Sequence, residues 1–511
     1  MSENWKIDRA RTYHQGTKHP DGSLLDPTHR YNPHNRPLLF KRYRDVETID
    51  LDVDAQGLQV PALTALAQTG VDPGSVNIPD LDQLASLLYF SAGITKRIHY
   101  KGYGEMFFRA ASCTGALYHI ELYVVCGDLP GVEAGVYHFD PASMKLDVLR
   151  RGDFRQIVAE AAGGHPAANT APAVIIFSDV PYRNACKYQA REYRHAYWDS
   201  GTILSHSLAA AFGEGLEHRL LMGFDDTRVN RLLGLDLSQE FSLALLTVGG
   251  NPGQSLPDPP DVKALDVEVE PAAEKVEAFP AIQSMHRASF LSSREDVSAW
   301  RENVVRLDPP SIPSRELIPL QPLSAEERPS DMLGEVIRRR GSSRQFARDS
   351  IGFQELSTIL IQSTRGVPAD FNAQTGLSQN MVYLIAHDVE GLESGTYVVH
   401  EEQEALQQLR QGSFRRESRT LALGQDLGGD CAAAVYFLTD LDEILPAYGN
   451  RGYRTAHMEA SISAGKMYLA AYALSLGATG LTFYDDQVTA FFSPHAEGKS
   501  VMFLIAIGVP G

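Results

Sequence analysis

The chain contains two copies of one sequence pattern, separated by a constant distance. Residues 132–137 read VEAGVY and residues 392–397 read LESGTY, while LRRGDFR at 149–155 returns as LRQGSFR at 409–415. Both pairs lie 260 positions apart, a period much longer than that of solenoid repeats. The pattern therefore predicts a tandem duplication of a whole domain.

The same register pairs charged and aromatic residues. It aligns Tyr188, Arg191, Tyr193 and Arg194 with Tyr448, Arg451, Tyr453 and Arg454. It also aligns Asp225-Asp226 with Asp485-Asp486. Paired carboxylates can bind a metal or exchange protons, but their presence in both copies favours a turn or a helix cap. No metal site is predicted from them.

Composition limits the class of protein. The 511 residues suffice for two or three domains. The formal net charge of −18 argues against a general nucleic-acid-binding surface. The four cysteines form no metal-binding spacing, and no stretch is apolar enough for a signal peptide or a membrane span. We therefore expect a cytoplasmic protein with no nucleic-acid or membrane partner.

The chain divides into four segments. The polar residues 1–45 are expected to form an arm with no counterpart in the second copy. Repeat one covers 46–255, a proline-rich linker covers 256–330, and repeat two covers 331–511.

Periodicity predicts the elements within these segments. Helical patterns at 81–92 and about 191–214 alternate with strand patterns at 117–125, 173–180 and 243–249. A further helix is expected at 282–303, inside the linker. Alternating elements without a βαβ glycine fingerprint predict an α+β fold.

Two arginines lie near the start of repeat two. Arg340 and Arg344 flank Ser342 in the motif RGSSRQF at 340–346. Forked guanidinium donors and a hydroxyl can converge on one phosphate, although a solvated basic face at a helix end would have a similar sequence. In repeat one, no Lys or Arg occurs over 45–95, where the equivalent residues are expected. Only repeat two can therefore hold a phosphate in this way.

Repeat one keeps a different feature, a strip of small residues before a strand. The strip consists of Ser112, Cys113, Thr114 and Gly115. Small side chains let a flat ring approach the backbone, and an ordinary loop before a strand is the alternative. The interval is shorter in repeat two, because Gly93 to Ser112 spans 19 positions whereas Gly366 to Asn372 spans 6. The two copies have thus lost complementary features.

These motifs resemble the flavin-dependent nitroreductase superfamily, and most of all its SagB-type dehydrogenases, which act in thiazole and oxazole peptide maturation. The resemblance rests on RxSxRxF, on the SxxGALY strip, on KYxxRxYR at 187–194 and on GFDD at 223–226. The chain departs from the SagB pattern at Ser112-Cys113, where that pattern has Pro-Ser, and at His119, where it has Pro.

The resemblance implies two α+β domains that form an intramolecular pseudo-dimer, with one FMN per chain between them. The implied phosphate ligands are Arg340, Ser342 and Arg344 of repeat two, and the implied ring contacts are Ser112, Cys113, Thr114 and Gly115 of repeat one. Gly480 is a further candidate for contact with the flavin. A second composite site would lack both the phosphate ligands and the strip.

The resemblance also implies that Lys187 and Tyr188 move protons beside the ring. Repeat two has Ala447 in place of the lysine and keeps Tyr448. Lysine can act as a base when desolvation lowers its pKa, and tyrosine can donate or relay a proton. A lysine exposed at the surface is the alternative interpretation.

The implied function is an FMN-dependent oxidoreductase that transfers hydride to or from flavin N5. Dehydrogenation of an azoline-like ring in a small molecule or peptide is the first hypothesis, and an NAD(P)H-dependent nitro or quinone reductase is the alternative enzyme. A non-catalytic flavin-binding or scaffold protein is the alternative from another class. Complementary loss favours an enzyme, since random decay would not be expected to spare one complete site. The sequence leaves further oligomerisation open.

Overall fold

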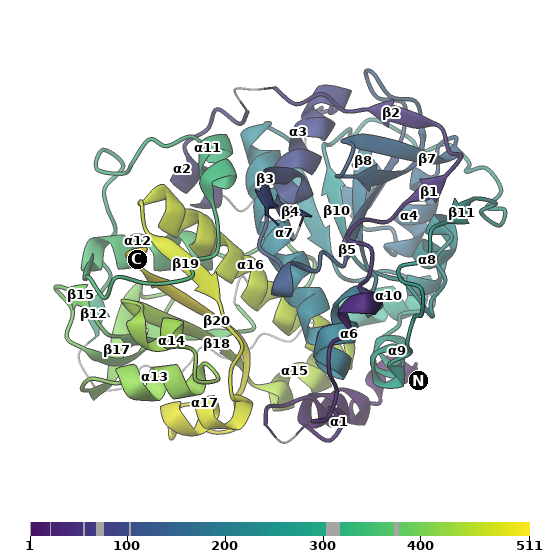
Figure 1. Cartoon of the computed structure of the whole chain (residues 1–511). Coiled ribbons are helices and arrows are strands. Elements are labelled where there is room, and N and C mark those ends of the chain that lie inside the picture. Colours follow the sequence, from purple (N-terminus) through teal and green to yellow (C-terminus); the bar gives the residue numbers. More distant parts are fainter. Residues whose placement is uncertain are drawn as a thin grey trace.

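The computed structural model describes residues 2–20, 22–54, 57–67, 76–101, 104–302, 317–372 and 378–511. The large sheet of repeat one lies on the right of Figure 1 and that of repeat two on the left, with two long helices between them. The end of the predicted linker helix, residue 303, lies outside the described residues.

The elements of the arm and linker are α1 (Asp8–Gly16), β1 (Tyr43–Arg44), β11 (Glu268–Val269), α9 (Pro280–Ala288) and α10 (Arg294–Glu302). Those of repeat one are β2 (Thr48–Asp50), α2 (Ala62–Ala67), α3 (Leu81–Ala92), β3 (Ile94–Tyr100), β4 (Gly104–Arg109), β5 (Ile120–Cys126), β6 (Gly135–Asp140), β7 (Lys145–Arg151), α4 (Arg155–Ala161), α5 (Pro166–Thr170), β8 (Ala173–Asp179), α6 (Tyr182–Tyr188), α7 (Glu192–Gly213), β9 (His218–Leu221), α8 (Asp226–Leu233) and β10 (Phe241–Val248). Those of repeat two are β12 (Ile318–Pro319), α11 (Leu333–Arg339), β13 (Ile351–Gly352), α12 (Phe353–Thr364), β14 (Met381–Ala386), β15 (Val389–Glu390), β16 (Gly395–His400), β17 (Ala405–Gln411), α13 (Arg415–Leu421), α14 (Asp426–Asp430), β18 (Ala433–Thr439), α15 (Leu441–Tyr448), α16 (Arg451–Ala473), β19 (Gly477–Gly480), α17 (Asp485–Phe492) and β20 (Ser500–Gly508).

Each repeat contains a seven-stranded antiparallel sheet. The strand order is β2-β7-β6-β5-β8-β10-β9 in repeat one and β12-β17-β16-β14-β18-β20-β19 in repeat two. The two orders are the same when the strands are matched in chain order. The structure therefore confirms two fused domains of one α+β fold.

Helices α7 and α16 pack against each other at the centre of the molecule (Figure 1). All residues from Glu192 to Ala211 in α7 are buried. A helix at the surface would keep one polar face toward solvent, so burial on all sides identifies α7 as the inner wall between the sheets. Side chains of both helices, including Leu204 and Met467, belong to one continuous hydrophobic core.

Most of the elements predicted from periodicity are present. The helical patterns at 81–92 and about 191–214 correspond to α3 and α7. The strand predicted at 117–125 begins only at Ile120. Gly115, Ala116 and Tyr118 have φ angles of 67°, 53° and 47°, and this left-handed backbone cannot continue a strand. It forms a tight turn before β5 instead.

The linker helix predicted at 282–303 is two helices, α9 and α10. The Oγ of Ser293 accepts a hydrogen bond from the backbone N–H of Asp296 at 3.1 Å. A serine in this position caps a new helix, so the helical pattern is interrupted between Ala288 and Arg294.

The prediction that residues 1–45 lack a counterpart is wrong. Helices α1 and α9 begin 272 positions apart, as do α3 and α12. Arg194 donates to the carbonyl of His14 at 2.7 Å, and Arg454 donates to the carbonyl of His286 at 2.8 Å. Each repeat therefore begins with an equivalent helix. The two copies are offset by 272 positions before the strip and by 260 positions after it, because the interval before the strip is shorter in repeat two. A search at the offset of 260 positions therefore misses this match.

A buried ion-pair cluster joins arginines of repeat one to a carboxylate of repeat two. Arg191, just before α7, and Arg194 of α7 lie 3.0 and 2.6 Å from Asp485 at the start of α17. Burial alone would raise the pKa of Asp485, but the two arginines hold it well below its usual value. The pairs therefore cross the interface in charged form.

The reciprocal cluster corrects the alignment of the aspartates. Arg451 and Arg454 of α16 lie 2.6 and 2.9 Å from Asp226 at the start of α8. Asp226 thus corresponds to Asp485, one position away from the alignment made by sequence. Asp225 caps α8 by accepting the N–H of Arg228 at 3.1 Å, which agrees with the predicted structural role.

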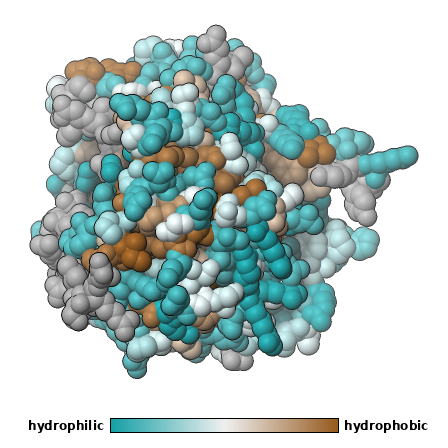
Figure 2. Space-filling view, turned by 90° about the vertical axis from the view of Figure 1, so that its left-hand side faces the viewer, coloured by the Kyte–Doolittle hydropathy of each residue, from teal (hydrophilic) through white to brown (hydrophobic). Residues whose placement is uncertain are grey.

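Neither the described helices nor the face shown in Figure 2 indicates a membrane-spanning segment or a large apolar patch. None of the described helices is both long and apolar enough to span a membrane. On the face shown in Figure 2, hydrophobic residues form short patches between hydrophilic side chains. Such patches are the ordinary apolar part of a folded surface.

Candidate active site

The strip of small residues lies between β4 and β5, and side chains of α7 hold its backbone. Asp199 accepts the N–H of Thr114 at 2.9 Å, the Thr114 hydroxyl at 2.8 Å and the Cys113 thiol at 3.1 Å. Thr202 donates to the carbonyl of Ser112 at 2.9 Å. Gly115 is exposed. Helix α7 therefore holds the strip on one side, and Gly115 is exposed to solvent on the other side.

A buried charge network lies behind the strip. His119 hydrogen-bonds to Asp179 at 2.7 Å and to Asp199 at 2.8 Å, with Glu192 at 3.3 Å. Burial alone would lower the pKa of His119, but these three acidic side chains raise it well above its usual value. Burial also raises the pKa of Glu192 well above its usual value. The directions of these shifts favour the charged form of His119 and the neutral form of Glu192.

This network also contains side chains of the types that bind metals. The ligand atoms of Cys113, His119 and Asp199 lie within 4.8 Å of one another. Asp199 already accepts hydrogen bonds from the other two and from Thr114. Hydrogen bonding thus accounts for their proximity. Burial raises the pKa of Cys113 to about 12, so its thiol stays protonated as a donor.

Arg340 connects repeat two to the strip of repeat one. It follows α11, and its Nε and Nη2 donate to the carbonyls of Ala110 and Arg109 at 2.6 and 3.1 Å. Its guanidinium also lies 5.7 Å from the ring centroid of Tyr468. The structure thus brings a residue of the RGSSRQF motif to the backbone just before the strip, although the two are more than 200 positions apart in the chain.

Of the other residues predicted to bind the phosphate, Ser342 lies near Gly480 and Arg344 is exposed to solvent. The Ser342 hydroxyl is 3.3 Å from the hydroxyl of Tyr468, which also accepts the N–H of Gly480. Gly480 is exposed at the end of β19. Arg344 is exposed and makes no hydrogen bond or ion pair within the described part of the chain. Its guanidinium is therefore available to an anion at this edge.

Tyr188 lies over the strip and Lys187 lies beside Tyr188. A Cβ placed on Gly115 would be 2.8 Å from the Tyr188 hydroxyl, so only glycine permits this approach. The Nζ of Lys187 is 4.9 Å from the Tyr188 ring centroid. Lys187 is exposed, which differs from the desolvated lysine that a base would require.

Aromatic side chains connect Tyr188 to the edge of repeat two. Ring centroids are 4.8 Å apart for Tyr188 and His195, 4.9 Å for His195 and Trp198, and 5.5 Å for Trp198 and Phe503. A Cβ on Gly480 would be 3.3 Å from Phe503. A continuous row of aromatic side chains therefore connects the candidate residues of repeat one with those of repeat two.

Sequence reasoning did not identify the α7 residues of this site. His195, Trp198, Asp199 and Thr202 recur at helical spacing, which predicts one face of the helix. That spacing was a usable signal, because a histidine, a tryptophan and an aspartate on one face of a central helix are uncommon in a purely apolar core.

The equivalent cleft at the other interface is closed by the shortened strip. The N–H of Leu220 in β9 donates to the carbonyl of Pro368 at 2.8 Å, and the N–H of Asp370 donates to the carbonyl of Leu220 at 3.0 Å. Strand β9 occupies in its sheet the place of β19. The edge that is exposed at Gly480 in the first cleft is therefore hydrogen-bonded in the second.

Side chains from the linker complete this closure. Asp370 accepts two backbone N–H groups at 222–223, at 2.8 and 2.9 Å. Arg301 of α10 donates to Asp370 at 3.2 Å. Trp300 is fully buried and its Nε1 donates to the carbonyl of Tyr448 at 3.0 Å. Within the described residues, the two equivalent interfaces thus differ. Gly115 and Gly480 are exposed at the first, which we call the open cleft, whereas Asp370 and Trp300 fill the second, which we call the filled cleft.

Comparison with known proteins agrees with this architecture. A crystal structure from Anabaena variabilis ATCC 29413, of a protein assigned provisionally to the nitroreductases, superposes with a TM-score of 0.75 at 26% identity. The superposition covers 98% of this chain and 99% of that chain.

Two curated relatives match part of the chain. The trifolitoxin-processing protein TfxB of Rhizobium leguminosarum bv. trifolii is 29% identical over 173 residues, which are 33% of this chain and 46% of TfxB. The microcin B17-processing protein McbC of Escherichia coli is 27% identical over 127 residues, 24% of this chain and 47% of McbC. Each match thus spans about half the length of the relative.

The model of the Nitroreductase family matches the chain twice, over residues 78–250 and 337–509. The matches together cover more than half of the chain, and they confirm the resemblance inferred from the motifs. The chain therefore belongs to the Nitroreductase family, as a tandem of two nitroreductase domains.

Proposed function

We propose that this nitroreductase-family oxidoreductase binds one FMN per chain, in the open cleft between its repeats. One observation carries the proposal. Of two pseudo-equivalent clefts, one joins Arg340 to the strip and keeps an exposed edge at Gly480, whereas the other is filled by Asp370 and Trp300. A chain that kept neither cleft open would favour the scaffold alternative.

The side chains around the open cleft fit this cofactor. Ser342 and the exposed Arg344 provide a hydroxyl and a forked cation for a phosphate. The pocket that adjoins Ser112 behind the strip has a cavity volume of only about 10 Å³, far below the roughly 300 Å³ at which ligand pockets usually begin. A flat ring is therefore expected on the exposed side of the strip, where Gly115 and Gly480 present no side chain.

Bound FMN would supply hydride transfer at N5. Asp199 fixes the strip, so its backbone needs no rearrangement when a ring is present. Tyr188, with its hydroxyl over Gly115, is placed to move a proton from a substrate above the strip. Lys187 is exposed beside it. We assign it the role of relaying that proton to solvent rather than that of a desolvated base.

The names of two relatives support a peptide substrate. TfxB and McbC are named for the processing of trifolitoxin and microcin B17. We therefore propose dehydrogenation of an azoline-like ring in a peptide. Bound FMN would accept the hydride of this oxidation, and Tyr188 would take the proton of the adjacent ring atom while its own hydroxyl proton passes to solvent. Reduction of a nitro compound or quinone by NAD(P)H is the second activity to assay.

The experiment is a flavin count on the purified protein. We expect visible absorbance at the flavin bands and about one FMN per chain after release. Arg344→Ala should lose most of the FMN, because it removes a charged donor to the phosphate. Arg348→Ala is the matched control, since Arg348 is exposed on the same loop and binds Asp430.

Two results would contradict the proposal. A count of two FMN per chain would mean that the filled cleft also binds cofactor. An Arg344→Ala variant with the same FMN content as Arg348→Ala would remove the phosphate assignment.

A further inference from the structure

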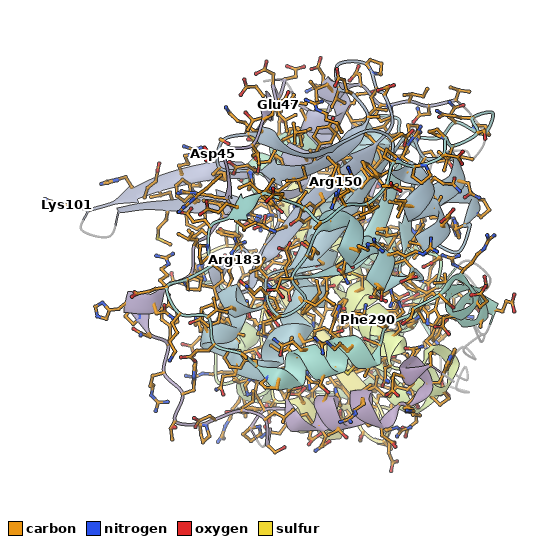
Figure 3. The ribbon with its side chains drawn as sticks, turned by 90° about the vertical axis from the view of Figure 1, so that its right-hand side faces the viewer. Asp45, Glu47, Lys101, Arg150, Arg183 and Phe290 are labelled. Carbon is orange, nitrogen blue, oxygen red and sulfur yellow. The ribbon has the colours of Figure 1, made fainter. Side chains whose placement is uncertain are left out.

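Strands β3 and β4 form a hairpin that projects from repeat one. Figure 3 shows it extending from the body, with Lys101 at its outer end, and an arm at the same height projects to the right in Figure 2. The two strands pair in antiparallel register, with Lys96 opposite Phe108 and Ile98 opposite Met106. Within the described residues they form a sheet of their own. Their outer edges therefore remain free.

One face of the hairpin is fixed to the body. Arg97 donates to the carbonyl of Ala142 at 3.4 Å and lies 5.5 Å from the ring centroid of Phe107. Phe107 in turn contacts Phe40 edge to face, with centroids 5.4 Å apart, and its carbonyl accepts the hydroxyl of Tyr118 at 2.7 Å. The hairpin is thus held in place by residues that alternate with those of its other face.

The other face carries apolar and basic side chains. Alternation along the strands places Lys96 and Ile98 there, opposite Phe108 and Met106. Met106 is 38% exposed and is one of six exposed large hydrophobic side chains in the described part of the chain. Lys96 and Lys101 are exposed, and neither forms an ion pair within the described ranges.

The charge of the hairpin is opposite to that of the whole chain. Residues 94–109 contain Lys96, Arg97, Lys101 and Arg109 but only one acidic residue, Glu105. The chain as a whole has a formal net charge of −18. A basic patch on an acidic protein attracts acidic ligands specifically to that patch.

The position of the hairpin connects it to the open cleft. Strand β4 ends at Arg109, whose carbonyl accepts Arg340, and the strip begins at Ser112. The corresponding interval from Gly366 to Asn372 in repeat two spans only 6 positions, too few for two such strands. The hairpin therefore occurs beside the open cleft and has no equivalent of similar length beside the filled one.

We propose that the β3–β4 hairpin is a docking arm for an extended acidic segment of the peptide substrate. Apolar side chains of the segment lie on Ile98, Met106 and Phe108, and its carboxylates pair with Lys96 and Lys101. A segment bound along the hairpin would lead the rest of the peptide to the strip. This inference rests on the proposed function for its ligand, and its test does not depend on turnover.

The test measures peptide binding by the whole purified protein. The probes are two fluorescein-labelled peptides of about ten residues, long enough to span a strand in extended form, one alternating Glu with Val and the other Lys with Val. Fluorescence anisotropy should show binding of the Glu peptide, weakened by added salt. The affinity should fall about tenfold in Lys96→Glu/Lys101→Glu, because two attractive contacts become repulsive.

A matched variant controls for net charge. Lys263→Glu/Lys275→Glu makes the same change on the exposed linker, and it should leave the affinity unchanged. Met106→Asp tests the apolar contact at an exposed position, where the substitution does not disturb the core, and it should also weaken binding. All variants should keep the FMN content of the unchanged protein.

Four results would overturn the proposal. They are equal affinity in the hairpin and linker variants, equal binding of the Lys and Glu peptides, unchanged affinity in Met106→Asp, and a change in the molecular mass of the assembly in Lys96→Glu/Lys101→Glu. The last would assign the hairpin to contact with a second copy of the chain. Loss of FMN in Arg344→Ala with peptide binding retained would separate this inference from the proposed function.

Discussion

Gly201 of α7 and Ser461 of α16 occupy the same position of the two repeats, and they meet each other at the interface. A Cβ built on Gly201 would overlap the Oγ of Ser461. One helical turn further on, a Cβ on Gly465 would overlap the Oγ of Ser205. At each point a glycine faces the serine that replaces it in the other repeat. A homodimer would place identical residues there, so the fused chain permits a closer fit.

This relationship predicts the outcome of an exchange. Gly201→Ser should destabilise the protein by about 1–3 kcal/mol, as overpacking does in a tight core. The double variant Gly201→Ser/Ser461→Gly should recover most of that loss, because the serine then faces a glycine again. Urea unfolding of the three proteins provides the measurement. Equal stability of the single and double variants would contradict the explanation that the serine at 201 is destabilising because it meets Ser461.

The ion pairs across the interface predict unequal effects of neighbouring aspartates. Asp485→Asn should destabilise the protein by about 3–5 kcal/mol, since it leaves Arg191 and Arg194 buried without a carboxylate. Asp486→Asn is the control, because the Asp486 side chain is 69% exposed, and its effect should stay within about 0.5 kcal/mol. Chemical denaturation distinguishes them. Similar effects would mean that the corrected alignment is wrong.

A buried lysine predicts a dependence of stability on pH. Lys466 is 2% exposed and donates to the carbonyl of Gly366, and burial lowers its pKa from 10.5 to about 8. Between these values the unfolded chain binds more protons, so the free energy of unfolding should rise with pH. Lys466→Met should stabilise the protein at pH 7 by about 2 kcal/mol. The exposed Lys263→Met should not.

The pH profile itself is the second readout. Unfolding of the unchanged protein should require more urea as the pH rises from 8 toward 10.5, and the Lys466→Met protein should lack this rise. A parallel profile in both proteins would show that Lys466 is not the responsible group.

The two equivalent tyrosines predict unequal effects on turnover. Tyr188→Phe should keep its FMN and slow dehydrogenation by about 10²–10⁴, the usual contribution of a positioned proton donor or acceptor. Tyr448→Phe should leave the rate unchanged, because the Tyr448 hydroxyl donates to the carbonyl of Phe371 in the filled cleft. Rates and FMN content are measured together. A Tyr188→Phe enzyme with normal rates on every substrate tested would end the assignment.

A weaker effect is expected for Lys187→Ala. Lys187 is exposed and lies 4.9 Å from the Tyr188 ring centroid. Its loss should spare the FMN and slow turnover less than the loss of the Tyr188 hydroxyl does. Normal rates in this variant would leave Tyr188 as the only proton carrier.

The duplication and the contact between the RGSSRQF loop and the segment before the strip could be predicted because they depend on local motifs. The register of 260 positions is visible in short identical segments, and the RGSSRQF loop and the strip each occur in one copy only. Their complementary loss suggests that they meet, and Arg340 contacts the carbonyl of Ala110 accordingly. Motif reasoning succeeds here because both partners are recognisable alone.

The filling of the second cleft could not be predicted in this way. Asp370, Trp300 and Arg301 belong to no motif, and they meet residues up to 148 positions away. Their roles depend on which backbone groups the fold brings to them. The alignment of Asp226 failed for a related reason, since a shift of one residue leaves two adjacent aspartates looking alike in sequence.

Helix α9 shows that part of the proline-rich linker belongs to the second copy. Because α9 repeats the role of α1, the second copy starts before residue 280, and the segment that connects the two copies lies between β10 and α9. Cutting the chain there would release two polypeptides, each with its own opening helix, and their swapped arginines and aspartates would still require each other. A chain cut at one peptide bond in this segment is therefore expected to stay assembled as a complex of two subunits.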